Sequence, residues 1–491
     1  MSSYKKLEKV FETIGNLEDA KAMLSWDASV MMPKKGATAR GRQMAAIESV
    51  IHSLLMDPNV KDYIEDAKTD TSLNEWQKTN LFEIELTWRH IMAVPAKLQE
   101  QFTMAGSACE MNWRETRPAN GFKAFAPFLT RVVDITREIA KLKSEAFGCT
   151  PYDALIDQFD PGTTSNQIDS VFNELKSFLP TLREKAMARQ TPAISLIGEY
   201  PVEKQKELGL ECLKAVNFDF DAGRFDVSLH PFCGGIPKDI RITTRYNTSD
   251  FTYALMGIMH ESGHARYEQK RPSEWLLQPV GKARGMAMHE SQSLLIEMQV
   301  SRSKEFLEFM QPKLKNILGL SDDKASIENL LATYRTVKPD FIRVEADEIT
   351  YPSHIMLRYD LEKALISGEL EVNDLPGAWN ELMQKYLGIT PNCDSNGCMQ
   401  DIHWPWGAFG YFPSYTLGAI IAAQIFTKVK KDLPNVLGDI RQGNFVPLQS
   451  WLEKNIHSLG SRYSTQELLQ KATGKKLDVA DYKTHLETRY T

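Results

Sequence analysis

The strongest chemical signal in the sequence is a His-Glu-x-x-His pattern formed by His260, Glu261 and His264. The surrounding stretch SDFTYALMGIMHESGHARYEQK has the apolar spacing of a helix. Residues four apart lie above one another on one helix face, so the two imidazoles can bind a single Zn²⁺ ion. Glu261 is rotated by roughly 100° from His260, which directs its carboxylate beside the ion, where it can accept a proton from water. The motif therefore predicts a hydrolytic metal centre.

A second copy of the tetrapeptide Met-His-Glu-Ser, at Met288–Ser291, is the natural source of the missing ligand. A catalytic zinc takes three protein ligands and keeps one open position. The stretch GMAMHESQSLLIEMQVSRSKEFLEFM again has helical spacing, and Glu290 and Glu297 lie two turns apart on one face, so either carboxylate fits. His289 is expected behind the ligands or toward the substrate, unless it is simply a half-buried histidine.

Composition and charge exclude several classes of protein. The chain has 491 residues, a net charge of −6 and a pI near 6.0, which argues against nucleic-acid binding. Six scattered cysteines indicate a reducing compartment, and charged residues near the N-terminus argue against a signal peptide, so we expect a cytoplasmic protein. The uncharged stretch Ile402–Thr427 contains several prolines and glycines, so it predicts a buried cavity wall and not a membrane span.

The elements that must position these residues are mainly helical. Helical spacing is clear in four stretches, residues 7–26, 74–92, 127–147 and 165–186, the last with Ser165 or Asn166 as a cap. Two short β-type segments, 224–230 and 239–247, flank the turn residues PFCGGIPK. They predict a small hairpin or sheet directly before the His260 helix. The absence of repeats and linkers predicts one two-lobed unit over residues 1–491, with an N-terminal helical region at roughly residues 1–110.

Beyond the metal motif, the sequence resembles the carboxypeptidase Taq family of metallocarboxypeptidases. The family's elements occur in order as His230-Pro231-Phe232; Asp239, Arg241 and Thr243; His260–His264; His289–Gln292; Ile342, Arg343, Ala346 and Asp347; and Gly397, Gln400, Asp401, His403 and Trp404. The early WDASVMMP around Trp26 and Pro33 is also similar to the family's N-terminal region. Each element is short, but the set spans most of the chain.

The resemblance implies a large helical zincin fold, saddle- or funnel-shaped, with a deep active-site groove. It implies a homodimer, one divalent metal per chain (zinc, with cobalt often active) and release of single residues from the C-termini of peptides. It also implies that His260, His264 and Glu290 are the metal ligands and that Glu261 is the base. Neither a nucleic acid nor a membrane is expected as a partner.

A carboxypeptidase must recognise a free carboxylate, and an arginine fork matches that group. Arg343 is the first candidate, and a buried structural ion pair is the alternative. Arg241 and His403 compete for the role, and Arg241 lies on a predicted strand that could pair with an extended substrate. His230 and His289 are further candidates for substrate contacts.

Hydrolysis also needs a hydrogen-bond donor at the developing oxyanion. Tyr411 and Tyr415 are candidates, since similar tyrosine pairs face the metal in related helical zincins, but two wall aromatics would give the same pattern. The alternative activities are those of an oligo-endopeptidase or a dipeptidyl carboxypeptidase on the same scaffold. A non-catalytic peptide-binding protein is the third alternative, and the intact Glu261 argues against it.

Overall fold

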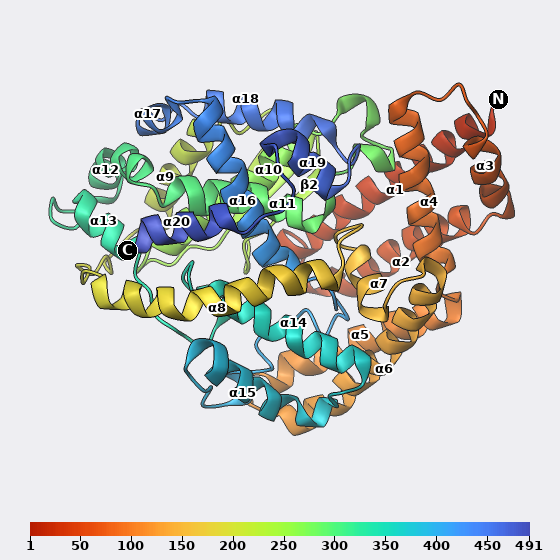
Figure 1. Cartoon of the computed structure of the whole chain (residues 1–491), viewed down its shortest axis with the longest axis horizontal. Helices are drawn as coiled ribbons and strands as arrows, with labels where there is room; N and C mark the ends of the chain where they lie inside the picture. The colour runs from red at the N-terminus through yellow and green to blue at the C-terminus, as the bar shows by residue number, and fades with distance from the viewer.

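The computed structural model describes residues 1–491 and is mainly helical, with one small β-sheet (Figure 1). The first half of the chain forms α1 (Ser3–Val30), α2 (Ala37–Leu55), α3 (Pro58–Lys68), α4 (Glu75–Met92), α5 (Ala96–Thr116), α6 (Phe122–Phe147), α7 (Pro151–Asp157), α8 (Ser165–Arg189) and α9 (Val202–Ala215). The four stretches with helical spacing fall within α1, α4, α6 and α8.

Side-chain caps explain where two of these helices begin. Asn74 and Gln77 form a reciprocal capping box at the start of α4, with both hydrogen bonds 3.0 Å long. At α8 the cap is Thr164, and the expectation of Ser165 or Asn166 was wrong by one or two residues. The amide of Ser165 instead donates to the Asp153 carboxylate, which ties α8 to α7.

Helices α1 to α4 pack around a hydrophobic cluster of their own. Its 12 buried residues run from Tyr4 to Ile84 and are separate from the main cluster of 88 buried residues. In Figure 1 these helices lie together at the right, in red and orange. The division of the chain into two lobes, with an N-terminal region at roughly residues 1–110, stays a prediction, and this separate cluster is in keeping with it.

A three-stranded sheet precedes the metal-motif helix, as expected, but its topology differs from a simple hairpin. It consists of β1 (Gly223–Val227), β2 (Cys233–Ile236) and β3 (Asp239–Thr244) in the order β1-β3-β2. The two predicted segments are parallel neighbours, and the presumed turn supplies the antiparallel edge strand β2. The tight return from β2 to β3 depends on Gly235, which has φ +87° and whose Cβ would lie 2.2 Å from the Asp239 carbonyl oxygen.

The second half of the chain returns to helix. It forms α10 (Thr252–Gln269), α11 (Gly285–Leu294), the π-helical turn η4 (Leu295–Ser301), α12 (Lys304–Leu318), α13 (Ile327–Tyr334), α14 (Tyr351–Ser367), α15 (Leu375–Leu387), α16 (Pro413–Asp432), α17 (Val436–Arg441), α18 (Val446–Asn455), α19 (Thr465–Thr473) and α20 (Ala480–Tyr490). The single helix expected over 285–310 is thus divided, because Ser303 caps a new helix through its hydroxyl.

Glycines permit an unusually close approach of the three helices at the centre of the molecule. A Cβ on Gly263 of α10 would lie 2.3 Å from the Gln292 carbonyl oxygen of α11. A Cβ on Gly418 of α16 would lie 2.8 Å from the Glu290 Cβ on the other side of α11. Helix α11 is therefore held between α10 and α16, and neither crossing leaves room for a methyl group.

The uncharged stretch from Ile402 supplies most of α16, whose residues are largely buried. None of the helices in the structure combines the length and apolar character required to cross a bilayer. The predicted role of this stretch as a buried wall is in keeping with its packing against α11.

The Gly263 crossing gives a stability prediction. Gly263→Ala should lower the free energy of unfolding by about 2–3 kcal/mol, because the added methyl meets the backbone of α11, which cannot move aside independently. Gly377→Ala is the matched control, since Gly377 lies in α15 with open space around it, and it should raise stability by about 0.5–1 kcal/mol. Denaturant titration measures both, and equal effects of the two substitutions would contradict the close packing.

Candidate metal centre

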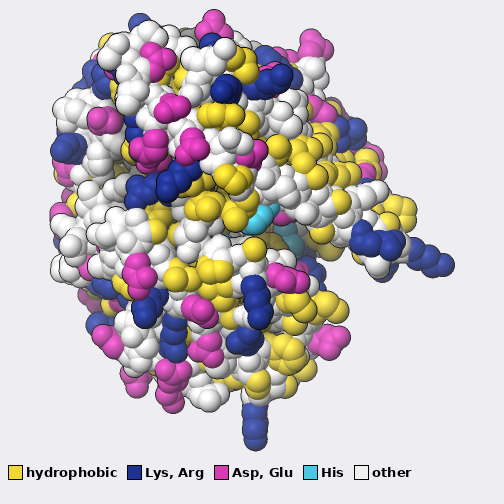
Figure 2. Space-filling view, turned by 90° about the vertical axis from the view of Figure 1, so that its right-hand side faces the viewer, with side chains coloured by type: hydrophobic (Ala, Val, Ile, Leu, Met, Phe, Trp, Pro, Cys, Tyr) yellow, Lys and Arg dark blue, Asp and Glu magenta, His cyan; other side chains and the backbone are white.

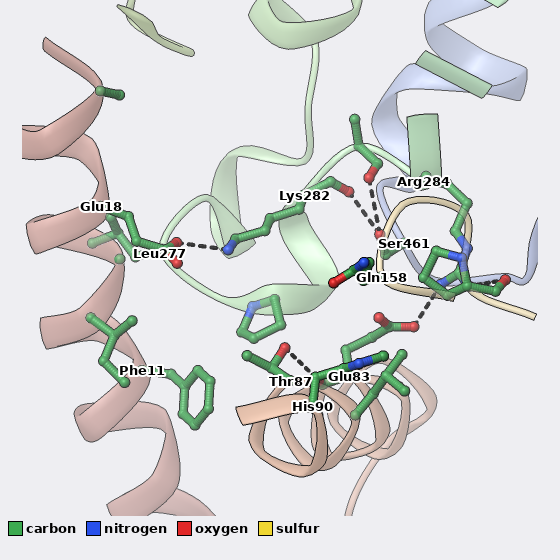
Figure 3. Close-up of a pocket in the computed structure, with 18 of the residues that line it drawn as sticks. Phe11, Glu18, Glu83, Thr87, His90, Gln158, Leu277, Lys282, Arg284 and Ser461 are labelled. Carbon is green, nitrogen blue, oxygen red and sulfur yellow. Dashed lines mark hydrogen bonds and ion pairs between the residues drawn. The ribbon is translucent and has the colours of Figure 1, made fainter. Parts of the chain in front are cut away.

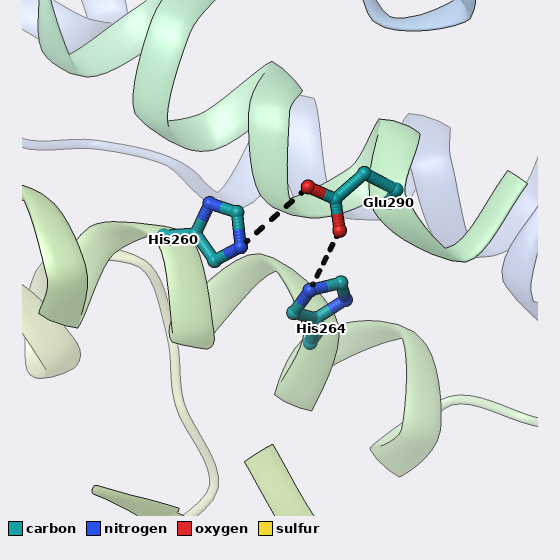
Figure 4. A group of neighbouring side chains, drawn as sticks. All are labelled: His260, His264 and Glu290. Atoms are coloured by element: carbon teal, nitrogen blue, oxygen red, sulfur yellow. Dashed lines mark ion pairs between the residues drawn. The ribbon is translucent and has the colours of Figure 1, made fainter. Parts of the chain in front are cut away.

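The side chains of His260, His264 and Glu290 converge where α10 crosses α11 (Figure 4). One ligand atom from each lies within 4.8 Å of the others. Nε2 of His260 is 3.9 Å from one Glu290 oxygen, and Nε2 of His264 is 3.3 Å from the other. Two imidazole nitrogens and a carboxylate oxygen in this arrangement are a donor set that catalytic zinc sites use.

Glu297 lies on the opposite side of the His260 ring. Its carboxylate is 2.9 Å from His260 Nδ1 and 2.7 Å from the guanidinium of Arg302. A carboxylate on the far ring nitrogen fixes the tautomer and orientation of a metal-binding histidine. Of the two carboxylates left open by the sequence, Glu290 therefore faces both histidines, whereas Glu297 holds one of them from behind.

His289 packs against the ring of His264 and does not join the converging group. The two rings stack at 4.5 Å, and the His289 Nε2 is 2.9 Å from the Glu268 carboxylate. Glu268 also accepts from Arg271. His289 thus lies between His264 and an ion pair, which restricts the orientation of the His264 ring.

Glu261 is buried beside this group and makes no hydrogen bond or ion pair with the protein. Burial raises its pKa to about 7, with Glu290 adding to the effect and His260 opposing it. An unpaired carboxylate with a pKa near neutrality suits proton transfer in either direction.

The electrostatics of the group favour a bound cation. Burial alone would lower the pKa of His260, but the carboxylates of Glu290 and Glu297 raise it to about 10. Burial and the neighbouring His289 lower the pKa of His264 to about 4. A proton on His260 thus compensates the carboxylates in the metal-free protein, and a divalent ion between the same groups would take over that role. The residues present fit such an ion.

The strand β3 and the loop before it lie over the first turns of α10. Thr243 binds the Phe232 backbone through its hydroxyl, which accepts from the amide at 3.1 Å. Gly257 lies on α10 one turn before His260. A Cβ added to Gly257 would lie 3.8 Å from the neighbouring Pro231, so the loop packs against this part of the helix. His230 is exposed at this edge, so its side chain is available to a ligand.

Arg343 has no free guanidinium fork. Its Nε and Nη2 both donate to Asp401 at 3.0 and 2.9 Å, and Nη1 donates to the Tyr351 hydroxyl at 2.9 Å. Asp401 also accepts from the fully buried Arg358 at 2.6 Å. This contact is the buried ion pair that was the alternative for Arg343, and its role in binding a terminal carboxylate stays a prediction.

The other expected cations are also engaged. The fork of Arg241 binds Asp239, and the guanidinium lies 4.4 Å from the ring centroid of Trp26. Burial and the nearby Arg343 lower the pKa of His403 to about 3, which leaves its imidazole neutral. A neutral His403 can donate or accept a hydrogen bond but offers no charge to a carboxylate.

Tyr411 and Tyr415 stack edge to face at 5.3 Å next to this cluster. The Tyr415 hydroxyl is 3.1 Å from His403 Nε2. Burial raises the pKa of both phenols, and the Glu290 carboxylate raises each of them further. Both tyrosines therefore lie within electrostatic range of Glu290 and keep their protons at neutral pH.

Arg245 is a cation that the sequence reasoning did not single out. It follows β3 directly, is exposed, and makes no ion pair or hydrogen bond through its guanidinium. Arg245, Glu261 and Glu297 all act on the pKa of Tyr253, so the four side chains share one region. The only available signal was its position at the end of the strand that leads into the metal helix.

A cavity of about 670 Å³ extends from His289 and Glu268 toward α1 and α4 (Figure 3). Most of its charged side chains are paired, as in Lys282–Glu18, Lys21–Glu48 and Arg284–Glu83. In the space-filling view of Figure 2, histidine side chains are visible at the bottom of a hollow with largely hydrophobic walls. The predicted deep groove is therefore present, and histidines lie at its floor.

Comparisons with known proteins agree with this geometry. The family model of the carboxypeptidase Taq (M32) metallopeptidases matches residues 6–490. Thermostable carboxypeptidase 1 of Thermus thermophilus is 36% identical over 100% of this chain and 98% of its own, and carboxypeptidase 1 of Bacillus subtilis is 34% identical over 99% and 98%. The solved structure of Trypanosoma cruzi metallocarboxypeptidase 1 is 38% identical, covers 99% of both chains and superposes with a TM-score of 0.97.

A carboxypeptidase of Pyrococcus furiosus, 32% identical over 100% of this chain and 99% of its own, has a TM-score of 0.96. The expected helical zincin fold is thereby confirmed. The chain belongs to the carboxypeptidase Taq (M32) family of metallopeptidases and is a metal-dependent carboxypeptidase.

Proposed function

We propose that His260, His264 and Glu290 bind one divalent ion, and that the protein releases single residues from the C-termini of peptides. The observation that carries this proposal is the convergence of the three ligands beside the unpaired carboxylate of Glu261. Zinc fits best, because two imidazoles, one carboxylate and one open position are its usual catalytic environment. Cobalt suits the same donors.

A divalent ion bound there would polarise the scissile carbonyl and acidify a water molecule. Glu261 then accepts the proton of the attacking water and delivers it to the nitrogen of the leaving amino acid. Its pKa of about 7 supports both steps, since proton acceptance and proton donation are then similarly favourable near neutral pH. The absence of a competing partner leaves its carboxylate free to move between the two positions.

The phenols of Tyr411 and Tyr415 supply the hydrogen-bond donor to the oxyanion. Both remain protonated at neutral pH, and both are influenced by the Glu290 carboxylate and so lie near the ligands. A donor already in place where negative charge develops stabilises the transition state more than the ground state. His403 orients Tyr415 through their 3.1 Å contact.

Arg245 anchors the terminal carboxylate of the substrate. It is an exposed cation without a protein partner, whereas Arg343 and Arg241 have their forks filled by Asp401 and Asp239. Arg245 directly follows β3, the strand that leads into α10, and this supports a position near the metal-motif helix. His230, exposed beside the start of α10, and His289 on the cavity side are available for further substrate contacts.

The cavity beside His289 accommodates part of the peptide. Its volume of about 670 Å³ is within the ordinary range for ligand sites, about 300–1,000 Å³. Asp19 lines it without an ion-pair partner, and burial raises the pKa of this carboxyl. A homodimeric assembly and a cytoplasmic location are predictions that rest on the family resemblance and on the six unpaired cysteines, respectively.

Peptides that differ only in an acid or an amide terminus test the proposed activity. The acid form should be cleaved with a kcat/KM about 10–10²-fold higher, because the amide loses a charge-assisted hydrogen bond to the anchoring cation. Mass spectrometry of the acid peptide should show successive losses of single residues. Losses of dipeptides would identify a dipeptidyl carboxypeptidase, and equal cleavage of both peptides with internal cuts would identify an endopeptidase.

The same peptides locate the anchor. Arg245→Met should slow the acid peptide far more than the amide and so narrow the gap between them. Arg241→Met is the matched comparison, since its fork already binds Asp239, and it should preserve the gap. The reverse pattern would transfer the anchoring role to Arg241.

Glu261→Gln should abolish turnover while the metal stays bound. The amide cannot accept a proton, so the expected loss in kcat is at least about 10²–10⁴-fold. The metal content of the purified variant, measured by elemental analysis, should equal that of the unmodified protein because Glu261 is not among the three converging ligands. Near-normal turnover, or loss of the metal, would show that another group is the base.

A further inference from the structure

The turn η4 is a short π-helical segment that directly continues α11 and carries Glu297. Single π-helical turns are rare and are frequent at functional sites. On a regular helix, Glu290 and Glu297 would lie on one face about 10.5 Å apart along the axis. Here the carboxylate of Glu290 faces Nε2 of His260 and that of Glu297 binds Nδ1, so side chains of α11 and η4 flank the ring on two sides.

The orientation of His260 therefore depends on where η4 places Glu297. Glu297 accepts from His260 at 2.9 Å and from Arg302 at 2.7 Å. These two contacts together fix the position of its carboxylate. Any displacement of η4 along or around its axis is transmitted to the imidazole through this hydrogen bond.

Arg489 of α20 holds the end of η4. Its Nη1 donates to the Met298 carbonyl oxygen at 2.5 Å, and its Nη2 donates to that of Gln299 at 3.3 Å. The last carbonyls of a helical segment lack partners within the segment, and a cation placed there also complements the helix dipole. The two carbonyls belong to the residues immediately following Glu297.

Arg489 is itself fixed by a buried carboxylate. Glu348 accepts from Arg489 at 3.0 Å, from the Tyr490 hydroxyl at 3.0 Å and from His485 at 2.7 Å. Glu348 is only 4% exposed, and although burial raises its pKa, Arg489 and His485 hold that pKa well below its usual range. The guanidinium thus bridges Glu348 and η4, because its Nη1 donates to both Glu348 and the Met298 carbonyl while its Nη2 donates to Gln299.

We propose that Arg489 is a positioning residue for the metal centre, and that α20 acts on metal binding through η4, Glu297 and His260. This inference rests on the proposed ligand set of His260, His264 and Glu290. It assigns to a helix distant in sequence from both metal motifs a role in metal retention, separate from its packing contribution to the fold.

The test is the affinity of the full-length protein for Zn²⁺, measured by competition with a chelator. Arg489→Met should weaken Zn²⁺ binding about 10-fold, a loss of the size seen when a partner of a ligand is removed. It should also alter the visible absorption of the Co²⁺-loaded protein, which reports ligand geometry. Arg489→Lys keeps the charge but not the two-pronged contact, so it should restore part of the affinity.

Two substitutions on the same helix separate positioning from packing. Leu486→Ala removes a fully buried side chain and should lower thermal stability without changing the Zn²⁺ affinity. Lys483→Met removes the 2.8 Å ion pair of α20 with Glu174 and should change neither strongly. If Leu486→Ala weakens Zn²⁺ binding in proportion to its loss of stability, or if Arg489→Met leaves the affinity and the Co²⁺ spectrum unchanged, the inference is overturned.

Failure of the ligand assignment would look different. Glu290→Ala should lose Zn²⁺ binding almost completely, and full retention in that variant would refute the proposed centre itself. If Glu290→Ala loses Zn²⁺ binding as expected and Arg489→Met keeps its full Zn²⁺ affinity, only the proposed role of α20 is refuted.

Discussion

The constraint on which the structure depends is the crossing of α10 and α11 at glycine distance. Gly263 allows the α11 backbone to approach so closely that a Cβ would be 2.3 Å from the Gln292 carbonyl oxygen, and Gly418 allows α16 to press on the other side. At this separation the Glu290 side chain of α11 lies 3.9 Å from Nε2 of His260 and 3.3 Å from Nε2 of His264. The close packing of α10, α11 and α16 thus also sets the geometry of the group formed by His260, His264 and Glu290.

This crossing explains why the tetrapeptide Met-His-Glu-Ser occurs twice with different roles. In both copies the methionine is fully buried, and the serine hydroxyl donates 2.7 Å to the methionine carbonyl, as in Ser262 and Ser291. The methionine and the serine therefore have the same buried position and the same hydrogen bond in each helix. The helices face each other, so the first presents its histidine and the second its glutamate to the shared centre, while Glu261 and His289 are left beside it.

The sequence was sufficient for the parts of the molecule that local patterns determine. Helical spacing located α1, α4, α6 and α8, and the His-Glu-x-x-His spacing located the two histidines on α10 that converge with Glu290. Three features depended on contacts between distant segments and could not be read locally. The edge strand β2 has the composition of a turn, η4 has the composition of a helix, and the partner of Arg343 is Asp401, 58 residues away. The sequence placed Glu297 on the same helix face as Glu290. Only the three-dimensional structure showed that Glu297 binds Nδ1 of His260 while Glu290 faces Nε2 of the same ring.

The charges around the centre show why it favours a divalent ion and not a proton alone. When Glu261, Glu290 and Glu297 are all ionised, the only guanidinium paired with any of them is that of Arg302. With neutral imidazoles the group then carries two net negative charges in a buried site, and a dication matches that number. A single proton on His260 compensates one of these two negative charges. A further proton on Glu261 would compensate the other, since burial raises the pKa of Glu261 to about 7. Binding of a divalent ion by His260, His264 and Glu290 would displace these protons, which would couple metal affinity to pH and leave the carboxylate of Glu261 available as a base.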